Sequence, residues 1–489
     1  MNAAALSARR RKLDGALRAP IELEAHLTEH VAKLRTGHLV MGWELAGIHA
    51  GGLTDGQLEA ARVGLMQTYR GIAAEGVHLW THWIHRARPA PIWSPRASGQ
   101  AFADAVTAGY AASLELSPVY EIRIWIWLVM DVGGPTDKWW QLGLVSVDTA
   151  QARERMVRAI RTIEGRARQL ERGLASFGPR RFGFFDVGGG NRGSEILEGF
   201  AFLANGGEAG PAVAVFPGDL SRAVLRSRVS FYPETVEIRA GASQRFAVGV
   251  GIREYPALTY PRMFTVLRVA ELEFIATHSF SCAARDTGRR KMRLKRDQLQ
   301  AHGDDAFSQV AGIGQALDEL RSGNLVMGAH QGCVMVFSDD AGALLDDVAD
   351  AVDAVGAPGL LAVREDLGLE AQWWAQLPGA VAHRPRASQV SHRNFVDFAP
   401  HYGAPRREGL HHWDEAVSVH RTSEGTGYEF SHHIEDAGNT FVCGMTGSGK
   451  TSLLAFWLCR FVQMGVRAMV LDKDRGLELA TRALGGSYV

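Results

Sequence analysis

The sequence has few cysteines, no long apolar run and no excess of charge of either sign. It contains 4 cysteines in 489 residues. None of them forms a CxxC pair or a zinc-type spacing with histidine, which argues against a structural zinc site and fits a reducing cytoplasm best. Lysine plus arginine equals aspartate plus glutamate, 53 against 53. No net field therefore draws the protein to nucleic acid or to an anionic membrane, and any such binding must come from local patches.

The apolar runs are too short for a membrane-spanning helix. Within residues 119–134 the uninterrupted apolar run Ile124–Met130 is far below the length of about 20 residues that a span needs, and its alternation predicts a strand. The basic cluster Arg9–Lys12 is followed by mixed polar and acidic sequence and not by the apolar core of a secretion signal. We expect a soluble protein, or one that is at most peripheral to a membrane.

Length and composition predict a globular chain of two or three domains, with 46% hydrophobic and 22% charged residues. Segments 37–48 and 77–87 have strand periodicity, and residues 53–74 between them have helix periodicity with Thr54 or Asp55 as the cap. A similar order recurs at 322–366. GHLVMG at 37–42 is echoed by GNLVMG at 323–328, which indicates two related α/β halves, although chance recurrence explains one hexamer equally well.

We therefore predict α/β and α+β architecture: a large N-terminal α/β region over 1–395, with halves of about 1–170 and 171–395, and a second domain over 396–489. Residues 171–215 are rich in glycine and predict loops and short elements, whereas 244–282 predict strands. The basic run GRRKMRLKR at 288–296 predicts a helix. The favoured interpretation of this run is a solvated helix face, and the alternative is a contact with nucleic acid or lipid. Past residue 396 a linker leads into short strands at 417–421 and 428–433.

The strongest pattern is a glycine-rich loop near residue 450. Residues 444–451, GMTGSGKT, match G-x-x-x-x-G-K-[ST] in full. Residues 440–443 predict a strand that enters the loop, and residues 452–464 predict a helix that leaves it and ends at Gly465. Glycines allow the backbone to wrap a phosphate, so that N–H groups and the helix N-terminus point at the anion. The pattern predicts the start of a RecA-like P-loop domain that takes ATP and Mg²⁺ as cofactors.

The residue types in the loop predict their roles. Lys450 would neutralise the β and γ phosphates as the catalytic lysine, and the Thr451 hydroxyl would ligate Mg²⁺. The predicted nucleotide-binding residues are Gly444, Met445, Thr446, Gly447, Ser448, Gly449, Lys450, Thr451 and Ser452.

The segment after this helix has an apolar run that ends in an acidic residue. Residues 466–472 predict a second buried strand, which ends at Asp472. Asp472 is followed by Lys473 and not by a glutamate, so we do not assign it as a Walker B aspartate. Asp472, Asp474 and Arg475 are candidates for positions beside the nucleotide, and a structural turn over DKDRG is an equally good interpretation.

Two other patterns carry less weight. Gly188, Gly190 and Gly193 formally match the dinucleotide-binding fingerprint, but no clear βαβ unit follows them, and a flexible loop is the better interpretation. His78 and His82 point the same way on a predicted strand yet stand about 13 Å apart by strand rise, too far to share a metal. His85 and the pairs at 411–412 and 432–433 fit metal binding no better.

The loop GMTGSGKTSLLAFWL (444–458) and the segment MVLDKDRGLELATRALGG (469–486) resemble the motor domain of the TrbE/CagE-type ATPases of conjugation and type IV secretion. Three upstream stretches agree in order: IREYPALTYPRMF (252–264), VREDLGLEAQWWAQLPG (363–379) and SHRNFVDFAPHYGAPRREGLHHW (391–413). Met445 replaces the proline common at that loop position, which contributes mainly backbone.

The resemblance implies a motor subunit on the cytoplasmic side of the inner membrane, hexameric when full-length, docked to inner-membrane components of the apparatus. It also implies a Walker B aspartate, a catalytic glutamate and interface arginines further along the chain than residue 489. We therefore expect this sequence to be an N-terminal portion that binds nucleotide weakly and hydrolyses essentially none. Two alternatives stay open: a non-catalytic assembly module, and a DNA translocase of the FtsK/HerA type.

Overall fold

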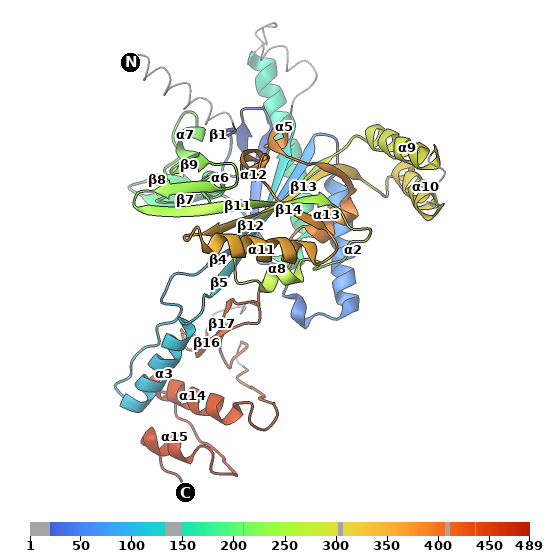
Figure 1. Cartoon of the computed structure of the whole chain (residues 1–489). Coiled ribbons are helices and arrows are strands. Elements are labelled where there is room, and N and C mark those ends of the chain that lie inside the picture. Colours follow the sequence, from blue (N-terminus) through green and yellow to red (C-terminus); the bar gives the residue numbers. More distant parts are fainter. Residues whose placement is uncertain (1–19, 133–148, 209, 302–306, 406–410, 436) are drawn as a thin grey trace. The chain divides into compact units, whose positions relative to one another are not determined.

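The structure, a computed structural model, describes residues 20–132, 149–208, 210–301, 307–405, 411–435 and 437–489. The chain divides into two compact units (Figure 1). The first unit comprises the chain up to Ile84 and from Arg123 to Gly403, and the second comprises His85–Ile122 and Ala404–Val489. The chain therefore passes between the units after residues 84, 122 and 403. The sequence predicted a domain boundary at 395/396 and two halves that meet near 170/171, and it gave no sign that 85–122 belongs with the C-terminal part.

The first unit is built on a 13-stranded sheet. Its strands follow the order β1-β2-β3-β5-β4-β12-β13-β11-β10-β9, while β6 pairs with β3, β14 with β11 and β15 with β13. The pairs β3–β5, β12–β13 and β11–β13 run antiparallel. This confirms a mixed α/β region, with a large antiparallel sheet at its centre. The bounds are β1 Leu23–His26, β2 Ala32–Leu34, β3 Leu39–Leu45, β4 Val77–Ala87, β5 Tyr120–Met130, β6 Pro179–Arg181, β9 Arg228–Phe231, β10 Val236–Ala240, β11 Ser243–Glu254, β12 Glu273–Cys282, β13 Met327–Ser338, β14 Leu361–Arg364 and β15 Ser388–Ser391.

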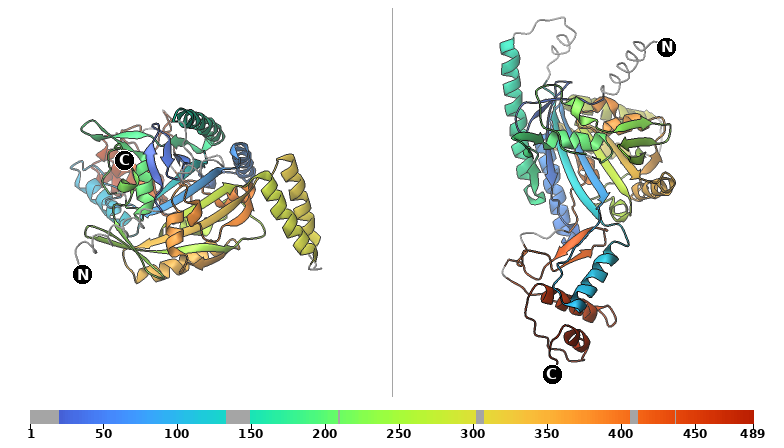
Figure 2. Two further views of the ribbon diagram at one scale, coloured as in Figure 1. Left: turned by 90° about the horizontal axis from the view of Figure 1, so that it is seen from above. Right: turned by 90° about the vertical axis from the view of Figure 1, so that its left-hand side faces the viewer.

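Helices cover both faces of this sheet (Figure 2). Helices α6 and α12 pack on the face that carries Trp127 and Met335. Helices α2, α5, α11 and α13 lie on the other face, where Trp43 donates its indole N–H to Glu171 of α5 at 2.8 Å. Tyr69 of α2 packs there against Phe395 of α13, with ring centroids 5.5 Å apart. The helix bounds are α2 Asp55–Ile72, α5 Thr149–Gly173, α6 Glu195–Ala204, α7 Ser221–Val224, α8 Thr265–Val269, α9 Arg285–Ala301, α10 Phe307–Ser322, α11 Ala343–Gly356, α12 Leu369–Ala375 and α13 His392–Phe398.

Local sequence explains the helix that joins β3 to β4. The Thr54 side chain accepts from the Gln57 main-chain N–H, and the Gln57 side chain accepts from the Thr54 N–H. This capping box satisfies two donors that the first turn leaves without partners. The predicted helix and its Thr54 cap are therefore confirmed, and so is the strand predicted over residues 77–87, which is β4.

The predicted loop region 171–215 holds more structure than expected. Eight of the ten residues of α6 are buried, and only Glu195 and Glu198 are polar, so its sequence shows a very narrow polar face. The glycines at 188–193 are also not a flexible loop. They lie in a hairpin of β7 (Phe184–Gly188) and β8 (Asn191–Ser194), in which Gly188 pairs with Asn191.

The second unit contains α3 (Ala101–Leu114), the hairpin of β16 (Ser418–Arg421) and β17 (Gly427–Phe430), α14 (Lys450–Gln463) and α15 (Glu478–Ala483). The predicted strands at 417–421 and 428–433 and the predicted helix at 452–464 are present, as β16, β17 and α14. Its core joins Val417 to Phe456 and Trp457 of α14. Phe430 stacks on Trp457 with ring centroids 4.9 Å apart and an interplanar angle of 8°.

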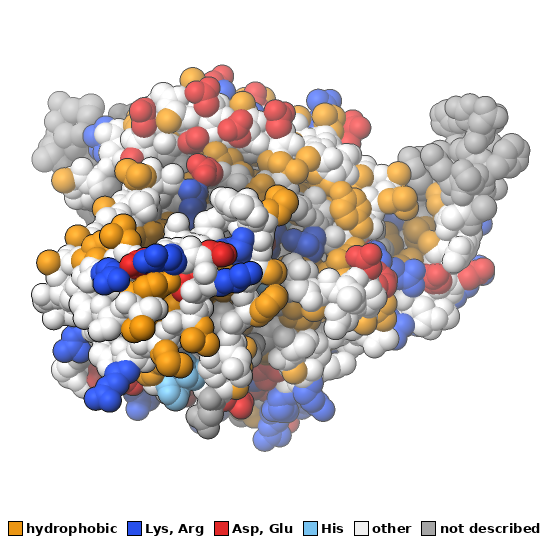
Figure 3. Space-filling view, turned by 90° about the horizontal axis from the view of Figure 1, so that it is seen from below, with side chains coloured by type: hydrophobic (Ala, Val, Ile, Leu, Met, Phe, Trp, Pro, Cys, Tyr) orange, Lys and Arg blue, Asp and Glu red, His pale blue; other side chains and the backbone are white. Residues whose placement is uncertain are grey.

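Two strands predicted in this unit do not form. Residues 440–443 and 466–472 have no strand assignment. A strand needs a hydrogen-bonded neighbour, and no described strand of the unit runs beside either segment. Several of their apolar side chains are exposed, Phe441 by 90% and Leu471 by 91%, whereas Val442 packs against the core of the unit. Figure 3 draws one face of the molecule and shows hydrophobic side chains among basic and acidic ones.

None of the helices in the described ranges combines the length and apolar character that a membrane span requires.

Candidate nucleotide-binding site

The glycine-rich loop leads directly into α14. Gly449 is the N-cap residue, with φ 88° and ψ 8°, and no side chain caps the helix. Gly447 also has a positive φ, of 84°. Both residues use the left-handed region that side chains other than glycine rarely adopt. The first-turn N–H groups of α14 have no acceptor within the helix, so they are available to an anion held by the loop.

The side chain of Lys450 folds back onto the loop. Its ammonium group donates to the main-chain oxygens of Gly444 and Met445, each at 2.7 Å. The Ser448 N–H donates to the Met445 oxygen at 3.2 Å, which tightens the same turn. The lysine therefore sits at the mouth of the loop with its positive charge held by two carbonyl oxygens.

The remaining predicted residues are exposed around this lysine. The side chains of Thr446, Ser448, Thr451 and Ser452 are open to solvent, and Met445 is 84% exposed. A Cβ atom at Gly444 would lie 2.6 Å from the Ser448 Oγ atom, so another residue at this position would require the serine side chain to rotate. The structure brings all nine predicted residues together, since they are contiguous.

The turn over residues 472–477 lies beside Thr451. A Cβ atom at Gly476 would stand 3.0 Å from Thr451 Cγ2 and 3.9 Å from its Oγ1. Gly476 is not among the residues predicted from the sequence, and its lack of a side chain allows this close approach. The candidate residues Asp472, Asp474 and Arg475 thus stand in a turn that touches the loop helix.

The Asp472 carboxylate is bonded within this turn. It accepts from the Leu477 N–H at 2.7 Å and from the Asp474 N–H at 3.3 Å, and Tyr488 donates its hydroxyl to it at 3.4 Å. Arg475 donates to Glu478 at 2.8 Å. These bonds shape the turn and the start of α15, which is the structural role weighed for DKDRG. That the three residues lie beside a nucleotide remains a prediction.

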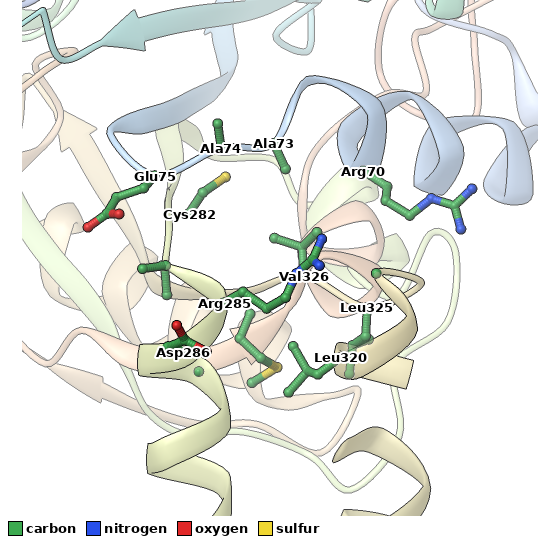
Figure 4. A pocket seen from close by; sticks show the side chains of 15 residues that line it. Arg70, Ala73, Ala74, Glu75, Cys282, Arg285, Asp286, Leu320, Leu325 and Val326 are labelled. Atoms are coloured by element: carbon green, nitrogen blue, oxygen red, sulfur yellow. The ribbon is translucent and has the colours of Figure 1, made fainter. Parts of the chain in front are cut away.

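The first unit also contains a cavity of about 380 Å³ (Figure 4). Its wall carries Arg70 and Arg285 together with Glu75 and Asp286, so charges of both signs face it. Cys282 in the wall is buried, and burial raises the pKa of its thiol to about 12. The thiol stays protonated near neutral pH and is not a nucleophile. We assign no ligand to this cavity.

The histidines of β4 have partners of their own. His78 Nδ1 lies 2.7 Å from the Ser281 hydroxyl, and His82 Nε2 lies 2.8 Å from the Gln376 oxygen, to which it donates. His85 stacks on Tyr120 with ring centroids 4.3 Å apart. Each histidine of this strand is therefore used in packing or hydrogen bonding within its own surroundings.

Two family models match the chain in sequence order. Residues 30–136 match the N-terminal domain of the type IV secretion system ATPase VirB4/TrbE, and residues 185–386 match the CagE, TrbE, VirB family, a component of the type IV transporter system. Together these matches cover most of the first unit, and neither extends to the glycine-rich loop.

Known relatives align over nearly the whole chain. The type IV secretion system protein virB4 of Bartonella henselae is 33% identical over 95% of this chain. The type IV secretion system protein PtlC homolog of Bordetella bronchiseptica is 30% identical over 97% of this chain. The protein virB4 of Agrobacterium fabrum is 34% identical over 57% of it. The chain covers 59%, 59% and 36% of these three relatives. On this evidence the chain belongs to the CagE, TrbE, VirB family of type IV transporter components and is a homologue of the VirB4-type secretion ATPases.

Proposed function

We propose that this chain is the nucleotide-binding portion of an energising ATPase of a type IV secretion or conjugation apparatus. The loop around Lys450 carries this proposal, because it combines a complete phosphate-binding motif with the lysine at its mouth and an uncapped helix behind it. The family supplies the context, since the relatives are named as secretion-system proteins.

The residues of the loop fit MgATP. Lys450 would exchange its two carbonyl partners for β and γ phosphate oxygens, because an ammonium gains more from an anion than from neutral oxygens. The N–H groups of Gly447 to Thr451 would face the same phosphates, with positive φ at Gly447 and Gly449 directing the backbone inward. The Thr451 hydroxyl is exposed at the first turn and would hold Mg²⁺, which supplies charge neutralisation across the β and γ oxygens.

We propose binding with little turnover for this chain. A hydrolysing site needs a carboxylate that orients water in line with the γ phosphate. Asp472 is one of the two carboxylates in the turn beside Thr451, and its oxygens accept from main-chain N–H groups of that turn. We expect purified chain to bind MgATP and to release phosphate at the background rate. Robust turnover would show that Asp472 or another residue completes the site.

The direct test is an equilibrium titration with a fluorescent ATP analogue, comparing the wild type with Lys450→Ala. A charge-assisted hydrogen bond contributes about 1.5–3 kcal/mol, so the variant should bind about 10- to 150-fold more weakly. Lys473→Ala is a matched control, because it removes the same charge from the nearby turn without touching the loop. Equal affinities for wild type and Lys450→Ala would refute the proposal.

Docking on the inner-membrane components and assembly into hexamers are part of the proposed function of the complete protein. The second candidate is an assembly module in which nucleotide plays no part. A groove of about 590 Å³ in the first unit, between the loop 255–259 and residues 389–394, favours it as a place for a partner segment. Capture of secretion-system membrane components that Lys450→Ala leaves intact, together with absent nucleotide binding by the wild type, would favour the module.

A further inference from the structure

Helix α3 comes from the N-terminal part of the sequence but belongs to the unit that holds the loop. It lies in the connection between β4 and β5, within the residues 30–136 that match the N-terminal domain model. The second unit nevertheless includes the whole of His85–Ile122. Its contacts there show what it does for the nucleotide site.

The first contact is a polar bond to the far end of the loop helix. The Gln463 side-chain amide of α14 donates to the Thr107 hydroxyl at 2.7 Å and to Asp104 at 2.8 Å, both on α3. Thr107 is 1% exposed. Its hydroxyl donates in turn to the Ala103 oxygen at 2.9 Å. A buried amide with fully used partners fixes one helix against the other, since leaving any member without a partner is costly.

The second contact is aromatic and continues along the same helix. Tyr110 of α3 packs on Phe456 of α14 with ring centroids 4.7 Å apart, and Trp93 packs on the same phenylalanine at 6.2 Å. The Arg460 guanidinium lies 5.0 Å from the centre of the Trp93 ring. It also donates to the Val417 oxygen at 2.7 Å. The middle of α14 is therefore clamped on α3 and on the segment that leads to it.

The third contact reaches the other element beside the loop. The Gln100 side-chain oxygen caps α3 by accepting from the Ala103 N–H at 2.6 Å, while its amide donates to the Ala483 oxygen of α15 at 2.8 Å. Helix α15 begins directly after the turn whose Gly476 lies against Thr451. Helix α3 thus contacts both α14, which carries Thr451, and α15, which follows the turn beside Thr451. Thr451 is the residue proposed to hold Mg²⁺.

We propose that α3 positions the nucleotide site, with Thr107 and Gln100 as positioning residues that act through α14 and α15. The inference rests on the proposed function, because it concerns the geometry of the same loop. The first residues of α14 hold the phosphates only if the helix points at them. Helix α3 sets that direction through its contacts with Gln463 and Phe456 of α14 and with Ala483 of α15. Neither residue touches the nucleotide.

The test compares three variants of the full chain by titration with a fluorescent ATP analogue in Mg²⁺ and by thermal unfolding. Thr107→Val keeps the shape and removes the hydroxyl, so we expect affinity to fall about 2- to 10-fold. Thr107→Ser restores the hydroxyl and should restore the affinity. Tyr110→Phe is the matched control. It removes the hydrogen bond of α3 to the Val419 oxygen, 2.9 Å long, in β16 and away from the loop.

If α3 had a structural role only, Thr107→Val and Tyr110→Phe would have the same effects. Their unfolding temperatures would be similar, and neither would change the affinity for the ATP analogue. Gln100→Glu is the second probe, because it keeps the capping oxygen and removes the donor to Ala483. We expect it to weaken binding in Mg²⁺ as Thr107→Val does. If the wild type does not bind, the proposed function fails and the inference with it. If the wild type binds and neither Thr107→Val nor Gln100→Glu changes affinity, the role of α3 is wrong while the proposed function stands.

Discussion

Replacing Gly449 by alanine tests whether the bent backbone of the loop is needed for nucleotide binding. Gly449 has φ 88°, and a Cβ atom there would meet nothing within 4 Å. The substitution therefore adds no clash and acts through the backbone alone. An alanine in the left-handed region costs about 1–2 kcal/mol. A free loop can relax away from this conformation, and binding has to restore it. Affinity should then fall about 5- to 30-fold.

Gly465→Ala provides the matched control at the other end of the same helix. Gly465 has φ 73° and also has open space where the Cβ atom would stand. Both variants should lower the unfolding temperature, because each strains one end of α14. Only Gly449→Ala should change the dissociation constant in a nucleotide titration. An unchanged constant for Gly449→Ala, or an equal change for both variants, would refute the reasoning about the loop.

Two further predictions concern the stability of the first unit. Burial lowers the pKa of His278 to about 3, helped by the nearby His82, and strongly lowers the pKa of His330. Both histidines stay neutral in the folded protein, whereas in the unfolded chain they take up protons below about pH 6.5, so the free energy of unfolding should fall by about 1 kcal/mol per histidine between pH 6.5 and 5.5. Urea midpoints that do not move over this pH range would contradict the prediction. Arg62 binds the buried Asp397 carboxylate through two bonds of 2.7 Å. Arg62→Ala should therefore lower the free energy of unfolding by about 3 kcal/mol. Arg158→Ala breaks the pair with Glu154, whose two side chains are 74% and 73% exposed, and should lower it by at most about 0.5 kcal/mol. Equal urea midpoints for the two variants would be evidence against the importance of the buried pair.

The elements that sequence predicted well carry their own local signal. Strand β4 is rich in apolar, aromatic and β-branched residues, and α2 has a capping box at Thr54. The loop at 444–451 is recognisable because phosphate binding needs glycines and a lysine at fixed spacing. Helix α6 lacks such a signal. Eight of its ten residues are buried, and its polar side chains are confined to Glu195 and Glu198.

Other features depend on partners far away in the sequence. Apolar residues at 440–443 and 466–472 have strand composition, but a strand forms only where another strand accepts its hydrogen bonds. No local pattern in residues 101–114 indicates that they pack against residue 456 or bond to residue 463. The loop was therefore predictable from its own residues, whereas the helix that holds it was not.

Hydrogen exchange of the peptide spanning residues 441–453, with and without MgATP, tests the central claim most directly. The account predicts that nucleotide slows exchange of the loop and first-turn amides, which lack acceptors within the helix. It also predicts that Lys450→Ala loses this protection at the same nucleotide concentration. Identical exchange with and without saturating MgATP would contradict the assignment of residues 444–452 as the nucleotide site.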